Sequence, residues 1–165
     1  MTSIQDFFQL GMARFIPALV EPPQGLAINL GAGNKHIPGT VALDLPEWDA
    51  DTEPIPYGDE IVACIHAYHF LEHVEDPIDM LREMQRVLVP GGVANIVVPY
   101  YNSQMQHQDL HHKNWFCEET WRVTFANPYY SQDGAGWRLR VGLNIIIGAV
   151  ERNLCLMTQL IKEEG

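Results

Sequence analysis

The stretch Leu26-Ala-Ile-Asn-Leu-Gly-Ala-Gly33 decides the fold, because a short, mostly apolar run ends abruptly in two glycines. A run of this length and composition is typical of a buried strand. Glycine lets the backbone turn tightly and lets a ligand approach main-chain N–H groups. Taken alone, Gly31 and Gly33 also suit an ordinary turn. The stretch predicts a buried strand followed by a candidate ligand-binding loop.

Further strands are predicted downstream from short apolar, β-branched runs. They cover residues 41–45, 60–65 and 93–98, and the chain ends in an antiparallel pair over residues 138–147 and 154–162. One amphipathic helix lies between the third and fourth strands. Asp76 suits its N-cap and Pro77 its first helical position, and the Pro90-Gly91-Gly92 triplet is expected to stop it.

Strands separated by helices or short crossovers predict an α/β fold with a mostly parallel central sheet, flanked by helices and ending in an antiparallel hairpin. We expect one domain over residues 1–165. Residues 1–25 form an N-terminal helical segment, 26–99 a ligand-binding core, and 100–165 a substrate loop and the terminal hairpin. Ligands of such sheets bind beyond the carboxyl ends of the strands.

The composition restricts the classes of partner. The net charge is −11, and no Lys or Arg lies between Lys35 and Arg82. Phosphate backbones and anionic lipids are bound mainly by Lys and Arg, so neither nucleic acid nor membrane is expected as a partner, although the charge also serves solubility. The three cysteines lack a CxxC pattern, and no apolar run approaches bilayer length, which favours a cytoplasmic protein.

Asp44 ends the second predicted strand, next to the glycine loop. A carboxylate at this position can accept both hydroxyls of a ribose, as in dinucleotide-binding folds. It can equally be a solvated strand end.

Five segments, taken together, resemble class I S-adenosylmethionine-dependent methyltransferases. They are Asn29-Leu-Gly-Ala-Gly33, Val41-Ala-Leu-Asp44, Ile55-Pro-Tyr-Gly-Asp-Glu60, Phe70-Leu-Glu-His-Val74 and Leu81-Arg-Glu-Met-Gln-Arg-Val-Leu-Val-Pro-Gly-Gly92. Their order and spacing agree with that family over residues 26–99, and the likeness extends to about residue 125. The resemblance implies a reduced Rossmann-like methyltransferase fold that uses S-adenosylmethionine.

By this resemblance, the glycine loop would pass beneath the methionine part of the cofactor and Asp44 would hold the ribose. Leu45 would lie against adenine, Asp51 would receive the adenine amino group, and residues 67–69 would flank the methyl end. The implied cofactor-binding residues are Asn29, Gly31, Ala32, Gly33, Asp44, Leu45, Asp51, Ala67, Tyr68 and His69.

The chain departs from the family pattern at three places. Asn29 stands where the family usually has an acid that helps to hold the cofactor's amino group, and Lys35 replaces a third glycine. Only ten residues separate Leu30 from Val41, too few for the usual crossover helix. We therefore expect a loop or a single turn there.

The histidines allow several interpretations. The string His69-Phe-Leu-Glu-His73 fits the H-x-x-E-H pattern of inverted zinc proteases, but a third ligand is not evident, and a packed, hydrogen-bonded helical His73 is favoured. The segment His107-Gln-Asp-Leu-His-His112 follows the fourth predicted strand. It suits a general base near the methyl group, a divalent metal site or a solvated loop.

The function predicted from the sequence is methyl transfer from S-adenosylmethionine to a small molecule. The candidate catalytic residues are Tyr68, His107, His111 and His112, and no metal site is expected. The alternative is a non-catalytic, degenerate module of the same fold that binds the cofactor or a protein partner.

Overall fold

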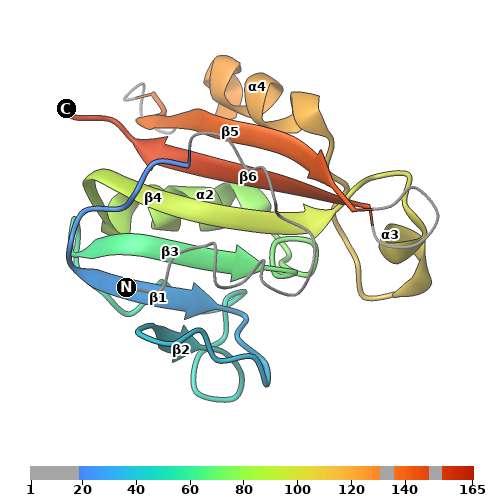
Figure 1. The fold of residues 1–165 in the computed structure, drawn as a ribbon, viewed down its shortest axis with the longest axis horizontal. Coiled ribbons are helices and arrows are strands. Elements are labelled where there is room, and N and C mark those ends of the chain that lie inside the picture. The colour runs from blue at the N-terminus through green and yellow to red at the C-terminus, as the bar shows by residue number, and fades with distance from the viewer. Residues whose placement is uncertain (1–18, 131–135, 149–153) are drawn as a thin grey trace.

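A computed structural model gives the fold and describes residues 19–130, 136–148 and 154–165. Its centre is a six-stranded sheet in the order β2-β1-β3-β4-β6-β5 (Figure 1). The strands β1 (Leu26–Leu30), β2 (Val41–Leu43), β3 (Val62–Tyr68) and β4 (Leu88–Pro99) are parallel. β6 (Cys155–Lys162) pairs antiparallel with both β4 and β5 (Leu139–Ile147). The predicted α/β fold is confirmed.

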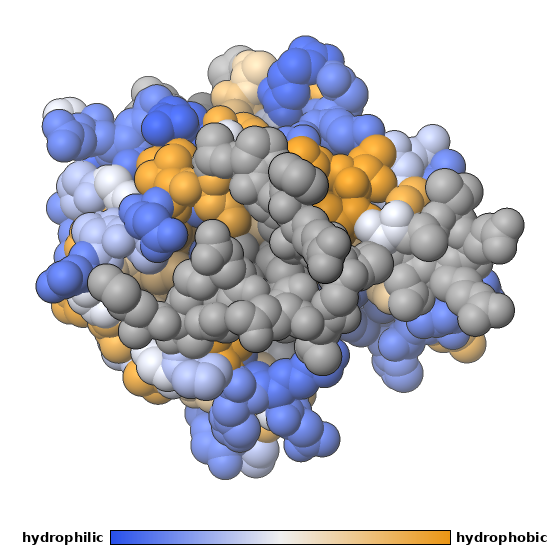
Figure 2. Space-filling view, viewed as in Figure 1, coloured by the Kyte–Doolittle hydropathy of each residue, from blue (hydrophilic) through white to orange (hydrophobic). Residues whose placement is uncertain are grey.

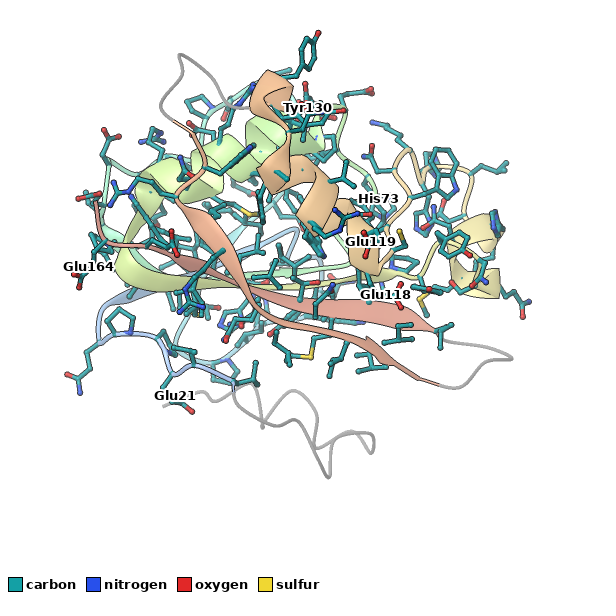
Figure 3. All side chains as sticks on the ribbon, turned by 90° about the horizontal axis from the view of Figure 1, so that it is seen from above. Glu21, His73, Glu118, Glu119, Tyr130 and Glu164 are labelled. Carbon is teal, nitrogen blue, oxygen red and sulfur yellow. The ribbon has the colours of Figure 1, made fainter. Side chains whose placement is uncertain are left out.

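The longer helices lie on one face of the sheet. Figure 3 shows α2 (Pro77–Val87) and α4 (Glu118–Ala126) on the same side, while residues 19–25 cross the opposite side without helix. The short α3 (Gln104–Gln108) and the 3-10 turn η1 (Pro128–Tyr130) complete the helices of the described residues, none of which is long and apolar enough to cross a membrane. Residues 31–40 form the expected loop. Most of the predicted N-terminal helix falls outside the described residues.

The sequence around α2 explains why this helix begins at Pro77. The Asp76 carboxylate accepts the backbone N–H groups of Ile78 and Asp79 at 2.8 and 3.1 Å, and so satisfies two donors that have no partner within the helix. Proline at the first helical position loses no hydrogen bond there. The helix ends at Val87, before the glycines expected to stop it, because Leu88 already starts β4.

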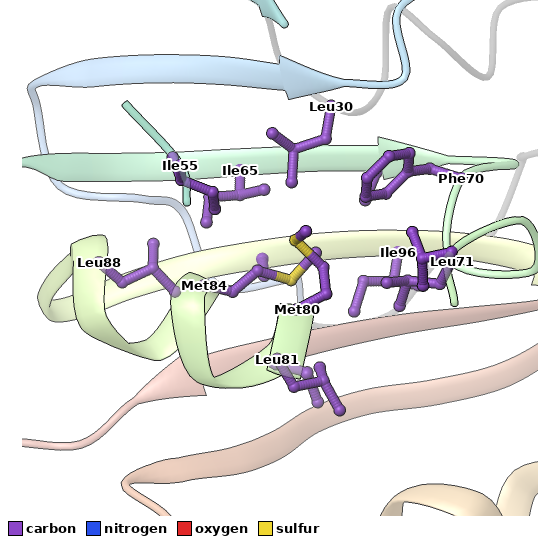
Figure 4. Packing of buried hydrophobic residues seen from close by; sticks show 14 of the residues in the cluster. Leu30, Ile55, Ile65, Phe70, Leu71, Met80, Leu81, Met84, Leu88 and Ile96 are labelled. Carbon is purple, nitrogen blue, oxygen red and sulfur yellow. The ribbon is translucent and has the colours of Figure 1, made fainter. Parts of the chain in front are cut away.

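α2 holds the main core against the sheet. Its buried residues are Met80, Leu81, Met84 and Val87, which recur at helical spacing and pack on strand residues such as Ile65 and Ile96 (Figure 4). Burial of one such side chain contributes roughly 1.5–3 kcal/mol. This packing anchors α2 on the sheet.

The opposite face of the sheet carries a buried polar row. Asn29, His66, Asn95 and Gln159 are direct neighbours across β1, β3, β4 and β6, and each is at most 4% exposed. The Gln159 amide donates to Asn95 at 3.0 Å and exchanges two hydrogen bonds with the Val20 backbone. Figure 2, drawn from this side, shows apolar surface among the described residues of this face.

Candidate active site

The candidate site is an open pocket of about 390 Å³ beyond the carboxyl ends of β1, β2 and β3. This is where a sheet of this topology binds ligands, and the volume lies in the range usual for them. Four loops contribute its lining: Gly31, Asp44, Leu45, Trp48, Asp49, Ala50, Asp51, His69, Phe70, His73, Val74, His111 and Lys113.

The glycine loop and Asp44 are bound to each other. Gly31 has a φ of 62°, and its N–H donates to the Leu43 carbonyl at 2.9 Å. The Asp44 carboxylate accepts the N–H groups of Gly33 and Leu45. A Cβ on Gly31 would lie 2.6 Å from the Phe70 ring, whereas a Cβ on Gly33 would have no atom within 4 Å. The loop is therefore packed from behind at Gly31 and open at Gly33.

Some residues expected around the cofactor lie elsewhere. Ala32 and Gly33 line an adjoining pocket of about 450 Å³, which shares Asp44 and Leu45 with the first. Asn29 is buried in β1, and its side-chain amide donates to the Lys35 carbonyl at 3.2 Å. Asn29 therefore ties the glycine loop to the sheet and does not line the pocket.

Asp51 lines the pocket, as expected from the resemblance, but its carboxylate already has partners. It accepts the Glu75 N–H at 2.8 Å and lies 3.6 Å from the Lys113 ammonium. Lys113 also donates to the Glu75 carboxylate at 2.7 Å. The lysine thus offsets part of the acidic charge at this edge of the pocket.

His69 and Glu72 form a pair in the turn after β3, at the side of the pocket that His69 lines. The His69 Nδ1 and the Glu72 Oε1 are 3.1 Å apart, and the Glu72 side chain is fully buried. Burial lowers the pKa of His69, but hydrogen bonds with the Cys155 thiol and the Glu72 carboxylate more than offset it and raise the pKa to about 9. His69 has a φ of 55°, a left-handed conformation that is uncommon outside glycine.

Ala67 and Tyr68 do not reach the pocket. Ala67 is fully buried in the core under α2. The Tyr68 side chain packs in the cluster of Val97, Cys155 and Met157, and its hydroxyl lies 2.9 Å from His66 Nδ1. Successive strand residues face opposite sides of a sheet, so the side chain next to Ala67 lies on the other face. The structure does not support a catalytic position for Tyr68.

The H-x-x-E-H string is not helical. Residues 69–73 form a turn, in which the His73 N–H donates to the Phe70 carbonyl at 3.0 Å. The shared helical face that a zinc-protease pair needs is therefore absent from this segment, and the expectation of a helical His73 was wrong. His73 is half-buried, lines the pocket and lies on the same side of the sheet as α2 and α4 (Figure 3).

The three remaining candidate catalytic histidines occupy different environments. His107 is exposed on α3, away from the lining residues. His111 lines the pocket with its side chain 89% exposed and lies 3.1 Å from Asp109. The His112 side chain is only 7% exposed, and its ring centroid is 4.8 Å from that of His73.

Sequence reasoning missed several residues of the site. Trp48 is buried in the loop between β2 and β3, where its indole N–H donates to the Pro54 carbonyl at 3.0 Å, and it forms a wall together with Phe70. A tryptophan in an otherwise polar, proline-rich loop is the signal that could have marked it. Lys113 gave no such signal, because only the fold brings it to Asp51.

The pocket fits the cofactor that the resemblance implies. The open space beside Gly33 admits a ligand against the backbone, Asp44 retains acceptor capacity for ribose hydroxyls, and Trp48 and Leu45 offer apolar surface for adenine. These residues belong to adjoining loops at one edge of the sheet, so one elongated ligand can contact all of them.

Comparison with known proteins agrees with this geometry. Residues 31–96 match a family model described as a methyltransferase domain. None of the curated proteins compared with the chain matches it.

Solved structures share the fold at low sequence identity. A chain from the complex of the Haloferax volcanii methyltransferase activator Trm112 with a methyltransferase has a TM-score of 0.63 at 16% identity, with 87% of this chain and 86% of that chain covered. The YcgJ protein of Bacillus subtilis has a TM-score of 0.57 at 14% identity, with 86% of this chain and 93% of that chain covered. A SAM-dependent methyltransferase of Aquifex aeolicus has a TM-score of 0.56 at 16% identity, with 84% of this chain and 82% of that chain covered. The match over residues 31–96 and the shared fold agree with the resemblance to class I S-adenosylmethionine-dependent methyltransferases.

Proposed function

We propose that this protein transfers a methyl group from S-adenosylmethionine to a small-molecule acceptor. The observation that carries the proposal is the pocket at the carboxyl ends of β1, β2 and β3, where Gly31, Asp44, Asp51 and His69 come together from separate loops. The strongly acidic composition favours a small acceptor over a polyanion such as nucleic acid.

The cofactor, when bound, supplies an electrophilic methyl group on a sulfonium. The protein's own part is then mainly alignment, because methyl transfer is an in-line displacement whose rate depends on holding two reactants in line. Asp44 would hold the ribose, and Asp51 would receive the adenine amino group. His69, His73 and His111 would surround the reacting end, where His111 is the exposed candidate for a general base.

The test combines binding with turnover. Titration with S-adenosylhomocysteine should give one site per chain, and labelled cofactor offered with a panel of phenols, amines and carboxylates should give a methylated product. Absence of heat with either cofactor form at millimolar concentration would contradict the proposal at its first step.

A second candidate function is a non-catalytic module of the same fold. Asn29, which holds the glycine loop in place of an acid, favours it. The structural neighbour solved in complex with a methyltransferase activator supports the part of this alternative that involves a protein partner. Cofactor binding without turnover on any acceptor class would select this alternative.

A further inference from the structure

Three side chains capable of binding a metal meet next to the pocket. Glu72 and His73 come from the turn after β3, and His112 comes from the segment after α3; one ligand atom from each lies within 4.8 Å of the other two. We propose that Glu72, His73 and His112 bind a single divalent metal ion. No metal site is expected from the sequence, in which no closed set of four ligands is evident; the fold brings His112 to the turn.

The buried carboxylate of Glu72 points independently to a cation. The Glu72 side chain has no exposed surface, and its Oε2 has no hydrogen-bond partner among the described residues, although Oε1 is paired with His69. A buried polar oxygen without a partner is costly. A metal ion beside it would satisfy this oxygen.

His112 is held in the orientation that a metal ligand needs. Its Nδ1 lies 3.0 Å from the Gln106 carbonyl oxygen, so that the ring donates its proton there. In the neutral tautomer the lone pair is then on Nε2, which lies 4.0 Å from the Asp109 carboxylate. A backbone carbonyl on the other ring nitrogen is a usual partner of metal-bound histidines. The ring is almost fully buried, so water competes little for that nitrogen.

The backbone around the three ligands is fixed by hydrogen bonds. The Glu72 carbonyl accepts the N–H groups of Lys113 and Asn114 at 2.7 and 3.3 Å. The Asn114 side-chain amide donates to the carbonyls of Leu71 and Val74 at 3.1 and 2.7 Å. The two chain segments that supply the ligands are therefore joined directly on both sides of Glu72.

The ligand set selects the class of metal. Two imidazoles and one carboxylate suit Zn²⁺ and other first-row divalent ions, whereas Mg²⁺ prefers oxygen ligands. Ligands bound at about 2.1 Å are at most about 4.2 Å apart, so a pair of ligand atoms 4.8 Å apart must close by at least about 0.6 Å. Small side-chain rotations supply that change.

The location gives the ion a role in recognising the acceptor, an extension that rests on the proposed methyl transfer. His73 also lines the pocket, and three protein ligands leave coordination positions open. An acceptor hydroxyl in an open position loses its proton to water more readily. The hydroxyl oxygen then forms a new O–C bond to the methyl group of the cofactor as the C–S bond breaks, and the electron pair of the C–S bond remains on sulfur. The acceptor class is thus an alcohol or phenol, preferably with two neighbouring oxygens.

The test uses the full chain without a polyhistidine tag. Calorimetric titration with Zn²⁺, Mn²⁺ or Mg²⁺ alone should give one site for Zn²⁺ and Mn²⁺ and much weaker binding of Mg²⁺. Glu72→Gln and His112→Ala should each weaken Zn²⁺ binding at least 10-fold, since even changes to outer partners of a metal site cost 10–100-fold. His107→Ala removes an exposed histidine of the same segment and should bind Zn²⁺ as the wild type does.

Two further readouts keep the test decisive if a variant folds poorly. Zn²⁺ should raise the melting temperature of the wild type and EDTA should reverse the rise, since binding to the native state alone stabilises it. Co²⁺ should give a visible absorption band that Zn²⁺ displaces. A wild type that shows neither effect and binds no ion would overturn the site, as would variants of Glu72 and His112 that bind like His107→Ala.

Failure of this site and failure of the proposed function are distinguishable. Titration with S-adenosylhomocysteine in EDTA tests the cofactor pocket without metal, and titration with Zn²⁺ alone tests the metal site without cofactor. Methylation of amines in EDTA at the full rate, together with no metal-dependent gain on catechols, would overturn the acceptor assignment while leaving methyl transfer intact.

Discussion

The Asp44 carboxylate accepts the backbone N–H of Gly33, which joins the end of β2 to the glycine loop after β1. The same carboxylate accepts the N–H of Leu45 at 2.8 Å. An ionised carboxylate has about four lone-pair positions, so these bonds leave capacity for two ribose hydroxyls. One side chain can therefore shape the loop and bind the ligand that the loop receives.

Asp44→Ala should weaken binding of S-adenosylhomocysteine by about 1.5–3 kcal/mol, or roughly 10- to 150-fold, the usual range for hydrogen bonds to a charged group. Isothermal titration calorimetry measures this change. Asp59→Ala removes a carboxylate that pairs with Arg86 outside the pocket and serves as the control. Equal losses in the two variants would argue against a ribose-binding Asp44.

The two glycines of the loop should differ in their effect on stability. Gly31→Ala adds a methyl group 2.6 Å from the Phe70 ring at a φ of 62°, whereas Gly33→Ala adds one in open space at a φ of 50°. Left-handed backbone costs about 1–2 kcal/mol for an L residue at either position. The clash at Gly31 adds about 1–3 kcal/mol. Urea unfolding should give a lower free energy of unfolding for Gly31→Ala than for Gly33→Ala. The reverse order would contradict this account of the loop.

Two changes in α2 should separate core packing from helix capping. Met84 is fully buried, and Met84→Ala should lower the free energy of unfolding by about 2–5 kcal/mol. Asp76→Ala removes the N-cap and should cost about 1 kcal/mol. Thermal or urea denaturation checks the ranking, with Glu164→Ala in the exposed C-terminal residues as a neutral reference. A larger loss of stability in Asp76→Ala than in Met84→Ala would contradict the view that core packing holds α2 more strongly than its N-cap does.

His66 should make the fold sensitive to acid. Burial lowers the pKa of His66 from 6.5 to about 4, and the ring packs between Cys64 and Tyr68 in the polar row with Asn29 and Asn95. The unfolded chain thus binds more protons than the native state between about pH 6.5 and pH 4, so stability falls as the pH decreases through that window. The full contribution is about 3 kcal/mol.

Urea unfolding at pH 7.5, 5.5 and 4.5 tests this prediction. The wild type should lose stability toward low pH more steeply than His66→Gln, in which an uncharged amide replaces the imidazole. Parallel pH profiles for the two proteins would mean that another group carries the acid sensitivity.

Sequence patterns predicted those parts of the fold that local chemistry determines. The N-cap at Asp76, the apolar run of β1 and the short β1–β2 connection were all correct. The limits of β3 were not, because the strand continues to Tyr68 through pairing with β4, a long-range contact. This extension places Tyr68 within the strand, where its side chain packs against Val97, Cys155 and Met157 and does not line the pocket.

The sequence indicated lining residues that follow a strand end, and the family resemblance added Asp51. Asp44 and Gly31 follow directly from strands and line the pocket as expected. The junction of Glu72, His73 and His112 depends instead on how the segment after α3 docks on the turn after β3, through backbone hydrogen bonds to Glu72. No spacing in the sequence encodes that docking.

The last prediction separates the two neighbouring histidines His111 and His112. His111 is exposed at the pocket, so His111→Ala should leave melting temperature and S-adenosylhomocysteine affinity nearly unchanged. If His111 acts as the general base, turnover of a surrogate acceptor should fall about 10²–10⁴-fold in this variant.

The His112 side chain is almost fully buried and bound to the Gln106 carbonyl, so His112→Ala, unlike His111→Ala, should lower the melting temperature. Labelled-cofactor assays and thermal melts on the same preparations measure both effects, with Arg122→Ala on the exposed face of α4 as the reference. Full turnover in His111→Ala would remove the general-base role from this residue, and an unchanged melting temperature in His112→Ala would contradict the packing described for its ring.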